Sequence, residues 1–329
     1  MENQKILVSG TPHVYDKTTT GVIMLDVLLA LAPAAIIGCV YFGLGAVTVV
    51  ALAVASAVLF EFLYQKIMKK PVTIRDLSAA VTGLLLAMNL PASAPWWLPI
   101  VGSFFAIVLA KQLFGGLGFN FINPALAARA FLLASYPQFM TDWSVFPLKA
   151  DAVSAATPLA VLKSGGYEAI TSDMGNILKT FIGFNKSGCI GEVCGAALVL
   201  GGIYLLARKV INWRIPFFYI GTAALLTWVF GRGGGWFTGR PGYELLIGGL
   251  LLGAFFMATD YTTSPITPKG RIIMGVGCGV ITVLIRLFSS GYPEGVSYSI
   301  LLMNLAVPLI DKATRPRVFG EVRKHAGNS

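Results

Sequence analysis

Long apolar runs alternate with short polar stretches along most of the 329-residue chain. An α-helix needs about 20 mostly apolar residues to cross a bilayer core of about 30 Å. Ten runs approach this length, and they cover residues 21–42, 44–64, 77–91, 96–114, 122–137, 189–208, 214–230, 242–259, 270–288 and 295–311. The pattern predicts an all-α polytopic membrane protein with about ten transmembrane helices.

The composition agrees with this prediction. Hydrophobic residues make up 56% of the chain and charged residues only 12%, which is too little polar surface to coat a soluble globule. Residues 1–20 are mostly polar, and the first apolar run is long enough to span a membrane. We therefore expect no cleavable signal peptide.

The distribution of Lys and Arg predicts the topology, because cytoplasmic loops of membrane proteins carry an excess of both residues. With a cytoplasmic N-terminus, seventeen of the 25 basic residues fall on cytoplasmic segments and seven on outer segments, while Arg129 lies within a predicted helix. We expect a protein of the cell membrane with both termini cytoplasmic and residues 138–188 outside. The net charge of +10 is explained by this asymmetry, so no nucleic-acid partner is expected.

The predicted helices form two groups of five around a polar segment of about fifty residues. The halves resemble each other, since Thr82 to Ala87 and Gly248 to Gly253 are similar stretches at corresponding places. Repeats with an odd number of spans enter the membrane from opposite sides, which makes them inverted repeats. The expected organisation is an N-terminal cytoplasmic segment, a first repeat, an outer segment, a second repeat and a cytoplasmic tail, with bounds 1–20, 21–137, 138–188, 189–311 and 312–329.

Glycine and proline interrupt several of the apolar runs, at residues 89–91, 115–118 and 260–265. Such interruptions predict broken helices, and irregular backbone at membrane depth must line a cavity or be buried in protein. The cavity could hold a cofactor. It could equally carry a solute, so an inverted-repeat channel or carrier for a small solute remains the alternative.

Several sequence blocks together are similar to one family. Residues 151–157 read Asp-x-x-Ser-x-Ala-Thr, which resembles the site at which FMN is joined through its phosphate to a threonine hydroxyl in membrane redox complexes. The other blocks are residues 75–86, 115–118 with 123–125, 188–192, 200–205 with 213–216, and 258–260. Over nearly the whole chain they resemble the family that includes the D subunit of the Rnf complex and the B subunit of the sodium-pumping NADH:quinone reductase. The length favours the Rnf branch.

The resemblance implies two flavins. A covalent FMN would sit on Thr157 outside, within a motif that also contains Asp151, Ser154 and Ala156, and a noncovalent riboflavin would bind inside. Two positions depart from the family pattern, since Ala155 stands where Gly is more usual and Tyr261 where Pro often follows. Neither departure removes a reacting atom, although Ala adopts a positive φ reluctantly.

Asn120 and Asn123 are the residues that the resemblance places near the riboflavin. An amide offers both a donor and an acceptor, which suits the alternating carbonyl and nitrogen edge of a flavin ring. The alternative is that both residues cap the next helix ahead of Pro124. Spacing alone slightly favours the cap.

The implied function is electron transfer across the membrane between the two flavins, within a complex that exchanges electrons between ferredoxin and NAD⁺ while moving Na⁺ or H⁺. No nucleotide-binding motif is visible, so no catalytic residue is predicted here. The implied partners are a peripheral subunit with its own outer FMN, membrane iron–sulfur subunits, and NADH-binding and ferredoxin-accepting subunits. A flavin transferase would be needed for maturation.

Seven ionisable residues lie in or at the edges of apolar runs: Asp26, Glu61, Asp76, Arg129, Glu192, Glu244 and Asp260. An unpaired charge there is expensive, so each is expected to face a partner or a wet cavity. We expect Glu192 and Asp260 near a flavin, and Asp26 and Asp76 are candidates for an ion path. Ion pairs that fix helix packing are the equally weighted alternative. The four cysteines lack paired spacing, so no metal site is predicted.

Overall fold

The structure, a computed structural model, describes residues 18–142, 144–145, 153–154, 159, 162, 181–182, 188–231, 236–289 and 294–316. These residues are mostly helical. Two short strands, β1 (Ser144–Val145) and β2 (Val153–Ser154), pair antiparallel, with Ser144 opposite Ser154.

The first half of the chain forms helices close to the predicted ranges. Its elements are α1 (Thr20–Phe42), α2 (Leu44–Ile67), the 3₁₀-helix η1 (Ile74–Asp76), α3 (Ser78–Met88), α4 (Trp97–Phe104), the π-helix η2 (Phe105–Gln112) that continues α4, α5 (Pro124–Ser135) and α6 (Pro137–Met140). Helix α3 ends at Met88, next to the predicted interruption at residues 89–91.

The second half follows after residue 188. Its elements are the 3₁₀-helix η3 (Ile190–Glu192), α9 (Gly195–Ala207), α10 (Arg214–Val229), α11 (Pro241–Leu246), α12 (Leu250–Leu252), the π-helix η4 (Gly253–Met257) that continues α12, α13 (Pro268–Phe288) and α14 (Val296–Thr314).

Four helices are long and apolar enough to cross a membrane, namely α1, α2, α13 and α14. Shorter apolar helices accompany them: α3, the continuous α4–η2 run, α5, α9 and α10. Large apolar side chains such as Leu44 and Phe288 are exposed on the outside of the bundle, as expected where the surrounding medium is lipid. The chain is a polytopic membrane protein.

Two predicted helices begin or end differently in the structure. The run at 189–208 was expected to be helical throughout, but α9 begins only at Gly195 because the preceding backbone pairs elsewhere: Cys189 forms a β-bridge with Pro91, and Ile190 N donates to Leu90 O at 3.1 Å. The run at 242–259 is broken between α11 and α12, where Gly248 has φ +79°.

A buried arginine stabilises the break between α11 and α12. The last carbonyls of a helix need partners from outside the helix. The Arg286 guanidinium of α13 donates to the carbonyls of Glu244 and Ile247, the latter at 3.2 Å. The interruption between α11 and α12 is therefore stabilised by specific hydrogen bonds from α13.

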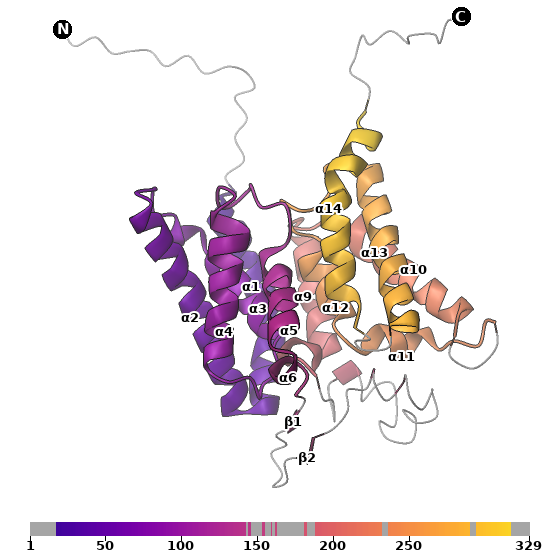
Figure 1. Ribbon diagram of the computed structural model, residues 1–329. Coiled ribbons are helices and arrows are strands. Elements are labelled where there is room, and N and C mark those ends of the chain that lie inside the picture. Colours follow the sequence, from indigo (N-terminus) through magenta and orange to yellow (C-terminus); the bar gives the residue numbers. More distant parts are fainter. Residues whose placement is uncertain are drawn as a thin grey trace, which may run out of the picture.

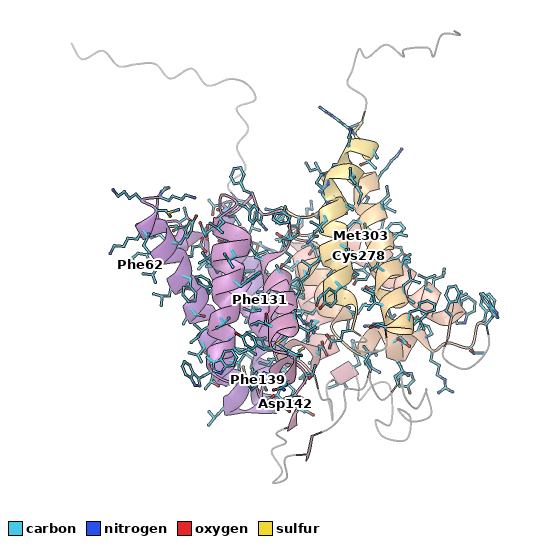
Figure 2. All side chains as sticks on the ribbon, in the orientation of Figure 1. Phe62, Phe131, Phe139, Asp142, Cys278 and Met303 are labelled. Carbon is cyan, nitrogen blue, oxygen red and sulfur yellow. The ribbon has the colours of Figure 1, made fainter. Side chains whose placement is uncertain are left out.

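The start of α1 and the end of α14 lie at one end of the bundle, and the β1–β2 hairpin lies at the opposite end (Figure 1). Figure 2 shows Phe139 and Asp142 toward the hairpin end, whereas Phe62 lies closer to the other end. Within each half, α2 packs on α3 and α10 packs on α13, while α1 against α9 and α5 against α14 join the halves. The ends of the described chain thus lie on one side, as the charge pattern predicts.

Glycines allow these helices to approach closely. A Cβ at Gly201 of α9 would lie 2.2 Å from the Ala30 carbonyl oxygen of α1, and one at Gly83 of α3 would lie 2.7 Å from the Ala53 carbonyl oxygen of α2. Membrane helices associate largely by close packing of small residues. The two contacts hold α9 on α1 and α3 on α2.

Candidate cofactor pocket

A pocket lies between the two halves, near the end of the bundle where α1 begins. Most of its lining is apolar. The polar lining residues are Ser78, Thr82, Lys111, Asn120, Asn123, Thr259, Asp260, Tyr261 and Thr262.

Asn123 is the N-cap of α5. Its Oδ1 accepts from the backbone N–H groups of Ala125 and Leu126 at 3.1 and 3.3 Å, and its Nδ2 donates to the Met257 carbonyl of η4 at 3.2 Å. The capping alternative is therefore confirmed for Asn123. The residue also joins the two halves beside the pocket.

Asn120 is in a different situation. Its side chain is 6% exposed and lines the pocket, and Nδ2 donates only to the Ile122 carbonyl, at 3.4 Å. Its Oδ1 accepts from no group in the part of the chain that the structure describes. Gly116 and Gly118, with φ +92° and +97°, shape the loop that leads to it. Of the two predicted amides, Asn120 retains free capacity for a ligand.

Asp260 also lines the pocket and lies in the loop after η4. Its Oδ2 accepts from the hydroxyls of Thr262 and Thr263 at 3.0 and 3.2 Å. Burial raises the pKa of the Asp260 carboxyl, and the two hydroxyl hydrogen bonds and the positive charge of Lys111 oppose that rise. The carboxyl is thus held in position beside the pocket by its own loop.

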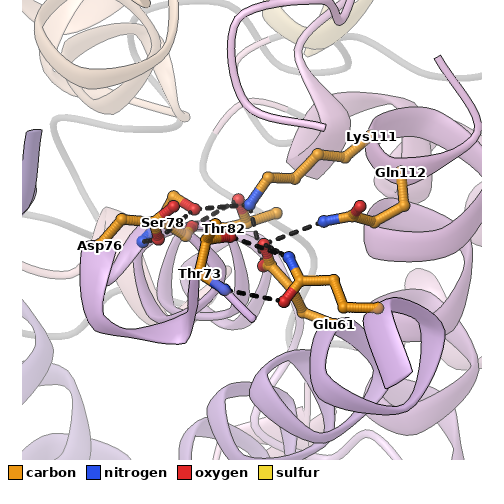
Figure 3. A network of polar contacts seen from close by, with 8 residues as sticks. Glu61, Thr73, Asp76, Ser78, Thr82, Lys111 and Gln112 are labelled. Atoms are coloured by element: carbon orange, nitrogen blue, oxygen red, sulfur yellow. Dashed lines mark hydrogen bonds and ion pairs between the residues drawn. The ribbon is translucent and has the colours of Figure 1, made fainter. Parts of the chain in front are cut away.

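A buried ion pair adjoins the pocket (Figure 3). Lys111 Nζ of η2 lies 2.9 Å from Glu61 Oε2 of α2, and their side chains are 2% and 1% exposed. Glu61 Oε1 accepts from Gln112 and Gln65 at 2.9 and 3.3 Å. Sequence reasoning used Lys111 only for topology. The signal that could have revealed the pair was an acidic residue in one apolar run, Glu61 in 44–64, and a basic residue in another, Lys111 in 96–114.

Lys111 also connects to Asp76 through one hydroxyl. Lys111 Nζ donates to Ser78 Oγ at 2.6 Å, and Ser78 Oγ donates to Asp76 Oδ1 at 2.7 Å. Asp76 also accepts from the Ser78 backbone N–H at 2.8 Å. Ser78 and Lys111 are buried, whereas Asp76 is partly exposed. A row of hydrogen bonds therefore runs from a partly exposed carboxylate to the pocket wall.

Asp26 belongs to another network. Its carboxylate accepts from the Tyr204 hydroxyl at 2.9 Å and pairs with Arg208 at 3.2 Å, both on the α9 side. No hydrogen bond connects Asp26 with Asp76 within the described ranges. The two candidates for an ion path thus lie in separate networks.

Glu192 lies in a second buried cluster and not on the pocket. The Arg129 guanidinium of α5 donates to Asn89 Oδ1 at 2.8 Å, to Cys189 Sγ at 3.6 Å and to Glu294. Ligand atoms of Cys189, Glu192 and Glu294 lie within 4.8 Å of one another, but the arginine already brings positive charge to this cluster. The structure thus separates Glu192 from Asp260.

The predicted attachment motif falls largely outside the described residues. Asp151, Ala156 and Thr157 lie outside them, and of Ser154 only the backbone, in β2, is described. Leu159 is two positions after Thr157, and it is buried together with Leu162 and Ile247 against Tyr243. The chain next to the motif therefore packs on the second half, at the break between α11 and α12.

Known proteins are similar to the chain over nearly its full length. The model of the NQR2, RnfD, RnfE family matches residues 7–320. The chain is 50% identical to the D subunit of a Na⁺-translocating ferredoxin:NAD⁺ oxidoreductase complex from Acetobacterium woodii, with 99% of each chain covered. It is 48% identical to the D subunit of a proton-translocating ferredoxin:NAD⁺ oxidoreductase complex from Clostridium ljungdahlii, with 96% of each covered. It is 37% identical to the D subunit of an ion-translocating oxidoreductase complex from Shewanella amazonensis, in a match that covers 95% of this chain and 97% of that one. On these matches, and with a helical membrane fold that agrees with them, the chain belongs to the NQR2, RnfD, RnfE family.

Proposed function

We propose that the chain is the electron-relaying membrane subunit of an ion-translocating ferredoxin:NAD⁺ oxidoreductase complex. It would carry electrons between a riboflavin in the pocket and a covalent FMN on Thr157 at the other side of the membrane. Its relatives at 50% and 48% identity are named for complexes of this kind, one moving Na⁺ and the other H⁺. The pocket between the halves is the observation that carries the proposal for this chain.

The residues of the pocket fit a flavin. The lining is largely apolar, as a flat aromatic ring system requires. Asn120 offers an acceptor and a donor along one part of the wall, and Lys111 and Asp260 supply a charge of each sign. These residues would hold the ring and fix its orientation, while the flavin itself would supply the electron-carrying chemistry.

The fold supports a flavin at each end of the bundle. The pocket lies near the start of α1, and the β1–β2 hairpin, which precedes Thr157 directly in the chain, lies at the opposite end (Figure 1). By the distribution of Lys and Arg the pocket end is cytoplasmic. The rate of electron tunnelling falls steeply with distance. Two flavins, one at each end of the bundle, would divide the distance across the membrane into shorter steps than a single flavin allows. Leu159, two positions after Thr157 in the chain, is buried against the second half.

The finer architecture of the proposal is ten membrane-crossing or membrane-embedded segments in two inverted repeats. In this assignment α1 to α5 correspond to α9 to α14, and the short α3 corresponds to α12 with η4. Three features support the assignment: α1 packs on α9, α5 packs on α14, and α2 packs on α4 as its counterpart α10 packs on α13. A site at the interface between repeats is typical of such folds.

Other subunits complete the proposed complex. The chain shows no nucleotide-binding motif, so the subunits that bind NADH and accept electrons from ferredoxin must be separate proteins. Membrane iron–sulfur subunits and a peripheral subunit with its own FMN would exchange electrons with the two flavins. A flavin transferase would attach FMN to Thr157.

The proposal is tested by mass mapping and in-gel fluorescence of the denatured chain, expressed with a flavin transferase. Wild type should fluoresce and carry an FMN-sized mass on the Thr157 peptide. Thr157→Ala should lose both signals, whereas the exposed Thr141→Ala, near the same end and outside the motif, should keep them. Acid extraction of the folded chain should release riboflavin from both variants. A dark, unmodified wild-type chain without extractable riboflavin would favour the solute channel.

A further inference from the structure

We infer that Asp76, Ser78 and Lys111 form a proton path from the cytoplasmic surface to the pocket, which supplies the protons that the bound flavin requires on reduction. The inference rests on the proposed function, because it takes the flavin as the occupant of the pocket. It assigns the Asp76 carboxylate a role in local proton supply and none in the translocation of ions across the membrane.

The inner end of the path is Lys111. Its ammonium group has three N–H donors, of which one is directed to Glu61 Oε2 at 2.9 Å and one to Ser78 Oγ at 2.6 Å. The third has no partner in the described part of the protein, and Lys111 lines the pocket. A buried side chain whose head is fixed by two hydrogen bonds can thus direct its remaining donor to a ligand.

The outer end of the path is Asp76. This residue ends η1 and is partly exposed, whereas Ser78 and Lys111 are 3% and 2% exposed. Asp76 Oδ1 lies 2.7 Å from Ser78 Oγ. One hydroxyl thus lies between the two ionisable groups (Figure 3). The row runs from a partly exposed carboxylate to a residue that lines the pocket.

The charged groups around Lys111 come from three elements. Glu61 belongs to α2, Asp76 to η1, and Asp260 to the loop after η4. The positive charge of Lys111 acts to lower the pKa of the Asp260 carboxyl. Glu61 Oε1 is bonded to Gln112 and Gln65, and its Oε2 accepts from Lys111 Nζ. Buried Glu61 thus fixes the position of Nζ, while the partly exposed Asp76 joins the path to water.

Each passage moves one proton and changes no other bond. Lys111 releases a proton from Nζ to a ring nitrogen of the reduced flavin and becomes a neutral amine. The Asp76 carboxylate takes up a proton from water and becomes a carboxyl group. The Ser78 hydroxyl then rotates, donates its proton to the Lys111 amine and receives the proton of the Asp76 carboxyl, which restores the carboxylate. The net change is one proton from the cytoplasm. Two passages serve a two-electron reduction, whose electrons come from the partner subunits.

Ser78→Ala is the sharpest test, because it removes the bridging hydroxyl and leaves the Lys111–Glu61 pair intact. The matched control is Ser103→Ala. Ser103 of α4 is also a buried serine, but it does not line the pocket, and its hydroxyl donates to the Ala53 carbonyl at 2.9 Å and takes no part in the path. Asp76→Asn tests the outer end without touching the pocket lining, and Ser78→Thr keeps a hydroxyl.

The measurement uses the whole purified complex under anaerobic conditions. Rapid mixing with reductant follows flavin absorbance and proton uptake by a pH-indicator dye, and acid extraction gives the riboflavin content. Ser78→Ala and Asp76→Asn should slow proton uptake about tenfold or more, in keeping with the size of proton-transfer effects. Their riboflavin content should equal that of wild type. Ser103→Ala and Ser78→Thr should behave as wild type, and formate should restore uptake to Asp76→Asn.

The outcomes separate the two proposals. A wild-type complex without extractable riboflavin would overturn the proposed occupant of the pocket. Flavin-loaded Ser78→Ala and Asp76→Asn complexes that take up protons as fast as Ser103→Ala would overturn the path alone. Loss of riboflavin from both variants, with retention in Ser103→Ala, would make the row of hydrogen bonds a binding element and would also overturn the path.

Discussion

Lys111 Nζ lies 2.9 Å from Glu61 Oε2, and the two side chains are almost completely withdrawn from solvent. The pair joins η2 to α2 next to the pocket. Removal of a charge from water is costly, and a buried ion pair offsets that penalty only while both partners and their further hydrogen bonds are in place. The pair is therefore sensitive to the loss of either member.

Lys111→Met should destabilise the fold strongly, by about 3–5 kcal/mol, because Glu61 would remain as a buried charge without its partner. The double variant Lys111→Met/Glu61→Gln removes both charges and should be more stable than Lys111→Met. Thermal unfolding of the purified chain in detergent, followed by intrinsic fluorescence, gives the ranking. A double variant less stable than Lys111→Met would show that the pair is not the origin of the effect.

A second comparison sets a buried arginine against an exposed one. Arg129 and Arg208 both pair with a carboxylate, but their side chains are 3% and 53% exposed. Arg129→Met should cost about 3–5 kcal/mol, because it leaves Glu294 and Asn89 buried without this donor. Arg208→Met should cost about 1 kcal/mol or less, since water reaches the guanidinium and Asp26 keeps the Tyr204 hydroxyl. If Arg129→Met and Arg208→Met lowered the stability equally in the same thermal unfolding measurement, the expectation that burial sets the cost would be wrong.

The helices were predictable because membrane helices must satisfy their backbone internally and present an apolar surface. The ranges of α1, α2 and α13 were predicted to within three residues at each end. The start of α9 and the break at Gly248 were not, because both depend on partners distant in sequence. Leu90 and Pro91 bind the backbone at Cys189 and Ile190, and Arg286 takes the carbonyls of α11.

The candidate site was predicted in part for a similar reason. Motif reading found Asn120 and Asp260, which line the pocket. It did not find Lys111 at the pocket wall, since a lysine near a helix end is usually a cytoplasmic anchor. Nor could it separate Glu192 from Asp260, because the distance between the two depends on how the halves pack. The roles proposed for Thr157 and its neighbours stay predictions.

The two asparagines near the pocket should respond differently to alanine. Asn120→Ala removes an amide with free hydrogen-bonding capacity, so it should lower extractable riboflavin and leave the unfolding temperature close to that of wild type. Asn123→Ala removes the cap of α5, which typically costs about 1 kcal/mol, and also the bond to Met257. Liquid chromatography of extracted flavin and thermal unfolding give the two readouts. Full riboflavin content in Asn120→Ala would remove this residue from the site.

The packing of α9 on α1 gives a test that is independent of any cofactor. A Cβ at Gly201 would lie 2.2 Å from the Ala30 carbonyl oxygen, which is backbone and can move only with the helix. Gly201→Ala should therefore destabilise the fold by about 1–3 kcal/mol, as overpacking does. Gly221 of α10 is the matched control, because a Cβ there meets nothing within 4 Å. Gly221→Ala should be neutral or stabilising by up to about 1 kcal/mol, since Ala is the better helix former. A Gly201→Ala variant as stable as Gly221→Ala in thermal unfolding would show that α1 and α9 are less closely packed than this structure places them.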